Sequence, residues 1–122
     1  MESEEAVILA NDAIRALGAL AQGHRLAAFR LLVQAGTSGL AAGVIAEQLD
    51  VPASSMSFHL AQLGHAGLVT QRRESRSIIY AANYAAMGGL MSYLTENCCA
   101  GVACIADTEC SPPVIAEKTN VA

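Results

Sequence analysis

The residues of this chain best suited to chemistry are four cysteines near its C-terminus. Three of them, Cys98, Cys99 and Cys104, lie close together. Two adjacent cysteines form only a strained disulfide with each other, so this spacing favours joint binding of an ion over oxidation. Thiolates are soft ligands that select soft ions. Three thiolates in a pyramid satisfy trivalent arsenic or antimony, so we expect these three cysteines to bind such an ion.

The fourth cysteine leaves other interpretations open. Cys110 could replace or supplement Cys104, and a site of four sulfurs would admit zinc, cadmium or lead. The adjacent pair alone could bind a methylated trivalent arsenical, which has two positions open to thiols. Oxidation could instead pair Cys98 or Cys99 with one of the later cysteines. In the simplest interpretation, Cys98 is a core residue, because it extends an apolar helical stripe.

A second set of polar side chains lies at the start of a helix predicted over about 53–66. Short hydrogen-bonding side chains let a helix end approach a phosphate or a base edge, and the backbone amides there add affinity for phosphate. Serine is a poor helix former, so several in one turn need a reason. In the simpler interpretation, the serines only cap the helix and the histidine is an ordinary surface residue. The candidates for DNA binding, all expected on non-core positions, are Ser54, Ser55, Ser57, His59 and Gln62.

Three of the seven basic residues cluster just after this helix. Arg72, Arg73 and Arg76 lie in a predicted β-hairpin, which could contact the DNA backbone or the minor groove. The formal net charge of −4 counts against a nucleic-acid binder, whereas this clustering counts for one. The alternative is a solvated turn in which Glu74 is a local partner.

Helices and a hairpin must position these side chains. Apolar residues at steps of three and four predict the helices, as with Ile14, Leu17 and Ala21 in the first and with Met56, Leu60 and Leu63 in the fourth. β-branched runs around a polar turn at 73–76 predict the hairpin. Pro52 separates two of the helices, because proline cannot continue a helix but can begin one. Gly23 is expected to end the first helix. The expected helices cover about 10–22, 24–35, 42–49, 53–66 and 83–97, and the expected strands cover 68–72 and 77–81. This order predicts a mostly α fold with a β-hairpin wing, a winged helix-turn-helix.

The length and composition of the chain limit its possible domain organisation and oligomeric state. We expect a single domain over 1–122, with a core at about 10–97 and a cysteine-bearing tail at 98–122. The hydrophobic fraction of 53% exceeds what so small a monomer can bury, so we expect a homodimer. No stretch approaches the ~18 apolar residues that span a membrane. Because the acidic start is also unlike a secretory signal, we expect a cytoplasmic protein without a membrane partner.

Catalysis is not expected from these residues. The chain has no Cys-x-x-Cys motif, no nucleophile–base pair and no phosphate loop, so we predict that it is not an enzyme and has no catalytic cofactor. The alternative from another class is a thiol module that binds metal and has no role on DNA. Such a module would show no salt-dependent binding to operator DNA.

The run from about 13 to 93 resembles the ArsR/SmtB family of metal-responsive winged-helix repressors. Three segments carry the resemblance: LGALAQGHRL at 17–26, SFHL at 57–60 and LGHAGLV at 63–69. The resemblance covers about two-thirds of the chain. It implies a dimer built from the first and last helices that binds double-stranded operator DNA in the metal-free state. One departure is Ala61, where many relatives have a lysine.

The resemblance also bears on the ion. Some relatives hold arsenic with paired cysteines in the helix before the recognition helix, but 42–47 contains none. Others bind zinc with aspartate and histidine on the last helix, and 83–97 contains neither. The C-terminal cysteines resemble those of a subset with a Cys-Cys pair and a third cysteine beyond the last helix. In that subset the third follows by six positions, whereas Cys104 follows Cys99 by five. This resemblance implies a repressor released by trivalent arsenic.

Overall fold

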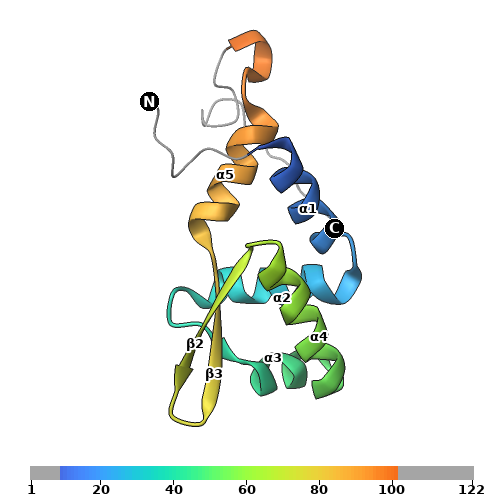
Figure 1. Cartoon of the computed structure of the whole chain (residues 1–122), viewed down its shortest axis with the longest axis vertical. Coiled ribbons are helices and arrows are strands. Elements are labelled where there is room, and N and C mark those ends of the chain that lie inside the picture. Colours follow the sequence, from blue (N-terminus) through green and yellow to red (C-terminus); the bar gives the residue numbers. More distant parts are fainter. Residues whose placement is uncertain (1–8, 102–122) are drawn as a thin grey trace.

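Helices dominate the part of the chain that the computed structural model describes, residues 9–101. The elements are α1 (Ala10–Leu20), α2 (Gly23–Ala35), β1 (Leu40–Ala41), α3 (Ala42–Leu49), α4 (Ala53–His65), β2 (Val69–Glu74), β3 (Ser77–Ala82), α5 (Tyr84–Thr95) and the short 3-10 helix η1 (Cys98–Gly101). Figure 1 shows α1 and α5 at one end of the molecule, and α3 and the tip of the β2–β3 hairpin at the other. The predicted winged helix-turn-helix is confirmed, and β1 is an addition to it.

Side-chain caps start two of the helices. Gln22 accepts a hydrogen bond from the backbone N–H of Arg25 at 3.0 Å, so α2 begins directly after it. The predicted end of the first helix at Gly23 is therefore wrong, because α1 ends earlier and Gly23 already belongs to α2. Asn83 accepts from the N–H of Ala86 at 3.1 Å and fixes the start of α5 in the same way.

A tight turn sets the angle between α3 and α4. Asp50 adopts the left-handed conformation, with φ 56°, and the N–H of Val51 donates to the carbonyl of Ala46 at 3.0 Å. This pattern closes the last turn of α3. Pro52 follows with φ −56° and is the N-cap of α4, so the predicted break at this proline is confirmed.

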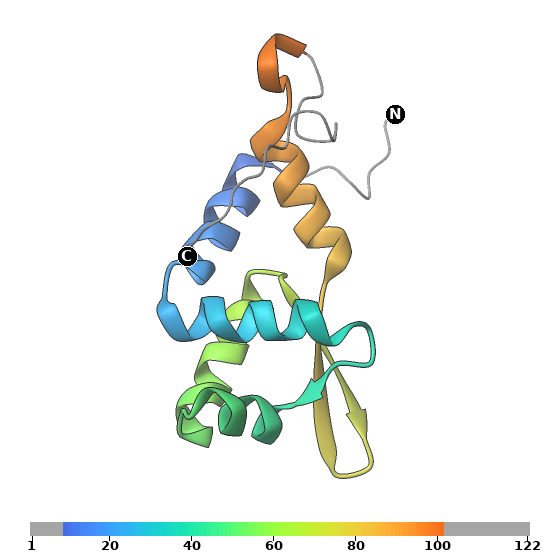
Figure 2. The ribbon, with the colours of Figure 1, turned by 180° about the vertical axis from the view of Figure 1, so that it is seen from behind.

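The three-stranded antiparallel sheet has the order β1-β3-β2. In the β2–β3 hairpin Glu74 pairs with Ser77, which leaves a turn of only two residues. Arg73 consequently lies within β2, one position before the end of that strand, and not in the turn where the sequence placed it. On the other side, β1 joins β3 by pairing Leu40 with Tyr80. Figure 2 shows this short strand beside the hairpin.

The core lies between α2, α3, α4 and the start of the hairpin. The three positions expected inside α4, Met56, Leu60 and Leu63, are fully buried, which confirms that stripe. The core includes the following fully buried large side chains: Leu32, Ile45, Met56, Leu60, Leu63 and Leu68. Within residues 9–101, no helix is long and apolar enough to cross a membrane.

The apolar stripe expected to mark the first helix is not its buried face. Small residues, Ala13 and Ala16, make the buried contacts of α1. Ile14 and Leu17 on the same helix are 66% and 43% exposed in the single chain. The predicted stripe identified an apolar face correctly, but that face points away from the core of this chain.

Candidate nucleic-acid interface and cysteine site

The start of α4 presents a polar surface. Ser54, Ser55 and Ser57 are exposed and Gln62 is half-buried. The N-cap of this helix is Pro52, so none of the serines occupies the capping position. Their hydroxyls therefore lie on the outer side of the first turns, where short donors and acceptors can reach a phosphate or a base edge.

His59 does not belong to this surface, and its predicted non-core position is wrong. The side chain is only 9% exposed, because position 59 lies three residues after Met56 and four before Leu63, on the buried face of the helix. Arg25 of α2 places Nη1 3.3 Å from Nδ1 of the ring. Burial, followed by the positive charges of Arg25 and His24, lowers the pKa of His59 below 6.5. The ring is thus kept neutral, with Nδ1 able to accept from the guanidinium.

Arg25 also reaches the end of α1. Its Nε donates to the backbone carbonyl of Ala19 at 2.8 Å. One side chain of α2 therefore contacts both α1 and the buried side of α4. Contacts of this kind fix the orientation of α4 relative to α1.

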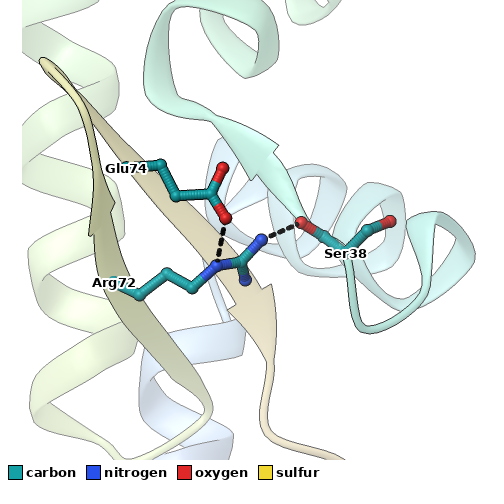
Figure 3. A network of polar contacts seen from close by, with 3 residues as sticks. All are labelled: Ser38, Arg72 and Glu74. Atoms are coloured by element: carbon teal, nitrogen blue, oxygen red, sulfur yellow. Dashed lines mark hydrogen bonds and ion pairs between the residues drawn. The ribbon is translucent and has the colours of Figure 1, made fainter.

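The arginines of the hairpin differ in their contacts. Arg72 donates from Nε to Oε2 of Glu74 at 2.7 Å and from Nη2 to the carbonyl of Ser38 at 2.8 Å, as Figure 3 shows. The alternative of Glu74 as a local partner is confirmed for this arginine. Arg73 and Arg76 are exposed and have no ion pair with another residue of the described part of the chain. Arg72 thus ties the hairpin to the α2–β1 loop, while the other two guanidinium groups face solvent.

A groove of about 530 Å³ separates α4 from the hairpin. On the helix side it is lined by Ala61 and Gly64, whose small size leaves room between helix and sheet. Thr70 and Gln71 line the β2 side with polar groups. The groove lies along the second half of α4, after the turns that carry the serines.

Comparisons with known proteins agree with this geometry. Residues 20–72 match a family described as a helix-turn-helix domain. An ArsR-like transcriptional regulator from Rhodococcus sp. RHA1 is 25% identical, with a TM-score of 0.61 over 69% of this chain and 76% of that one. The homodimeric winged helix-turn-helix DNA-binding domain of a possible ArsR-family regulator from Mycobacterium bovis is 28% identical, with a TM-score of 0.59 over 79% and 89%. HlyU from Vibrio cholerae is 30% identical, with a TM-score of 0.55 over 77% and 97%.

This chain belongs to the ArsR family. It is a transcriptional regulator with a DNA-binding winged helix-turn-helix, in which α4 is the recognition helix and the β2–β3 hairpin is the wing. A comparison with curated proteins gives no significant match.

The cysteines of this ArsR-family chain are described only in part. Cys98 is half-buried at the start of η1, and Cys99 follows it in the same short helix. Cys104 and Cys110 lie outside the described residues. Residues 9–101 contain no cluster of three or more histidine, cysteine, aspartate or glutamate side chains able to hold a metal ion. Two residues separate the adjacent pair from the end of α5, and the binding of an ion by these cysteines stays a prediction.

Several large exposed apolar side chains gather at the α1–α5 end of this ArsR-family fold. Met91 and Leu94 of α5 are more than half exposed, as is Ile14 of α1, and the two helices pack against each other. Both views of the ribbon show the two helices together at the end remote from the wing tip. We call this surface, formed by Ile14, Leu17, Met91 and Leu94, the α1–α5 face.

The sequence interpretation missed one exposed residue of the recognition helix. Phe58 is 58% exposed, although phenylalanine is usually buried. Its position lies off the buried stripe that Met56, Leu60 and Leu63 define. That spacing was a usable signal, because a large aromatic residue outside the core stripe of a helix must face either solvent or a partner.

Proposed function

We propose that this ArsR-family regulator is a repressor that binds operator DNA as a metal-free dimer. Its release follows when trivalent arsenic, or antimony, binds thiolates at its C-terminus. The observation that carries the DNA half is the row of exposed serines on the first turns of α4, beside a wing whose Arg73 and Arg76 are exposed and form no ion pair with another described residue. The arsenic half is supported by the adjacent cysteines that follow α5.

On DNA, the N-terminal part of α4 enters the major groove, and Ser54, Ser55 and Ser57 donate to base edges and phosphates. Gln62 lies one to two turns further along and contacts the backbone or an adenine edge. The exposed guanidinium groups of Arg73 and Arg76 bind phosphates or the minor groove. Arg72 holds the wing in place through Glu74 and the α2–β1 loop.

The dimer forms through the α1–α5 face. Its exposed side chains are too large and too numerous for a surface that stays in water, and a second copy offers the same apolar chemistry under two-fold symmetry. A dimer places two recognition helices on two half-sites, about one helical turn of DNA apart.

The ligand is sensed at the end of the same face. Cys98 and Cys99 lie in η1, which two residues separate from the end of α5, and Cys104 supplies the third thiolate, with Cys110 as the alternative third ligand. The thiols lose their protons as they bind the ion, and the tail is drawn onto the end of α5. Since α5 belongs to the dimer interface, this capture changes the angle between the two recognition helices. A coupling of about 1–3 kcal/mol lowers operator affinity by roughly 5- to 150-fold.

The test is fluorescence anisotropy of labelled DNA from upstream of the coding region, bound by the full chain without oxygen and with reductant present. Arsenite is expected to release the DNA, and antimonite to act similarly. Methylarsenite, cadmium and zinc are added in parallel. Release by arsenite under these conditions would exclude thiol oxidation as the signal, whereas release only by cadmium or zinc would contradict the arsenic assignment.

A matched pair of variants assigns the third ligand. Cys104→Ser is expected to bind DNA normally and to lose the response to arsenite, because two thiolates remain for an ion that takes three. Cys110→Ser removes a thiol from the same tail and is expected to respond as the wild type does. The reverse pattern would move the third ligand to Cys110.

A further inference from the structure

An aromatic side chain stands among the serines of the recognition helix. Phe58 follows Ser54 by four residues and Ser55 by three, and these spacings bring side chains together on one face of a helix. All three side chains are exposed. A phenyl ring so close to the groups proposed to read DNA enters the same groove as they do.

The phenyl ring of Phe58 packs against the neighbouring imidazole ring of His59. Its centroid lies 5.8 Å from that of the His59 imidazole, in an edge-to-face arrangement with an interplanar angle of 64°. His59 is itself fixed by the contact of its Nδ1 with Arg25 at 3.3 Å. Aromatic pairs favour this geometry, so the buried imidazole acts as a support for the exposed phenyl ring.

The location of Phe58 separates it from the dimer surface. The N-terminal part of α4 lies beside α3, at the end of the molecule away from α5, as the colours of Figure 1 show. The neighbouring exposed side chains on its helix face are polar or small: Ser54, Ser55 and Ala61. A protein partner would need a broader apolar surface, whereas one ring among hydroxyl groups fits a DNA groove.

We propose that Phe58 reads the C5-methyl group of a thymine in each operator half-site. The methyl is the one apolar group that a base presents in the major groove, and phenylalanine is among the side chains that contact it. The inference rests on the proposed binding of operator DNA by α4. Phe58 thereby adds a sequence-determining contact that carries no hydrogen bond, while the serines supply the hydrogen bonds.

The test removes only the methyl group from the DNA. A tight-binding duplex is selected from a random library with the wild-type chain, and every thymine is then replaced by uracil, first together and then one at a time. Burying one methyl group is worth about fourfold in affinity, so we expect a loss of about 15-fold for two half-sites. The loss should map to one thymine in each half-site.

Two protein variants, tested on the same thymine and uracil duplexes, show whether Phe58 makes this contact. Phe58→Ala is expected to bind thymine and uracil duplexes equally, because the ring that senses the methyl is gone. Leu26→Ala, which truncates an exposed apolar side chain on α2, should keep the full difference. Wild-type protein that binds the selected duplex with no preference for thymine would overturn the assignment of Phe58 alone. Failure to select any preferred duplex would overturn the proposed operator binding as well.

Discussion

The two ends of the molecule place their large apolar side chains in opposite ways. In the recognition helix, Met56 and Leu63 are buried, and the exposed positions other than Phe58 are polar or small. In α1, alanines make the buried contacts and Ile14 and Leu17 face solvent. A helix that buries its small residues and exposes its large ones is not packed for a monomer. The helix-turn-helix is complete within one chain, whereas we expect a second copy to complete the α1–α5 face.

Placing charge on the α1–α5 face should have the largest effect. In the double variant Leu17→Asp, Leu94→Asp, dimerisation would bury four carboxylates without partners, at a high cost in free energy. We expect a monomer in sedimentation equilibrium and an operator affinity at least about 100-fold weaker, because two linked half-site contacts become one.

The matched control is Gln34→Asp, which adds a carboxylate to an exposed position of α2. It should remain dimeric and bind DNA as the wild type does. A double variant that is still dimeric would show that another surface forms the dimer.

At the other end, removing a single wing arginine should have a moderate effect that depends on which one is removed. Arg73→Ala and Arg76→Ala each lose a phosphate contact, so the slope of log affinity against log salt should fall by about one per subunit. Arg72→Ala should leave that slope nearly unchanged, because its guanidinium is already bound to Glu74 and Ser38. Anisotropy titrations at several salt concentrations measure the slopes, and three equal decreases would contradict the distinction.

The smallest effect is expected at the buried histidine that supports the recognition helix. Its folded-state pKa is lowered, so as the pH falls below about 6.5 the unfolded chain takes up a proton at His59 more readily than the folded chain does. The free energy of unfolding of the wild type should therefore fall over that range. His59→Gln, which has no titrating group, should lose less stability in urea unfolding between about pH 7.5 and about pH 5.5. Parallel pH profiles for the two proteins would exclude this role.

The sequence predicted burial best where the spacing of apolar residues along a helix separates its buried face from its exposed face. The four-and-three spacing of Met56, Leu60 and Leu63 predicted the inner face of α4, and Pro52 predicted where that helix begins. The same spacing assigns position 59 to the inner face, but the polar nature of histidine was given more weight than its position. The polar contact of this buried ring is with Arg25, which is 34 residues away in sequence and enters no local pattern.

Other features could not be predicted from a single chain. Periodicity showed that Ile14 and Leu17 share a face, but it does not say whether that face packs on the same chain or on another. β1 has two residues, too few for any alternation. The bond from Arg72 to Ser38 joins segments 34 residues apart, so the sequence interpretation treated all three arginines alike.

That bond has a consequence for when the wing becomes ordered. Because Arg72 fastens the hairpin to the loop before β1, the wing is ordered when the chain folds and not when it meets DNA (Figure 3). Binding then involves little further loss of conformational entropy in the hairpin, so the attraction between its exposed guanidinium groups and phosphates contributes almost fully to affinity. A hairpin without the hydrogen bond from Arg72 to Ser38 would need stronger contacts with DNA to reach the same affinity.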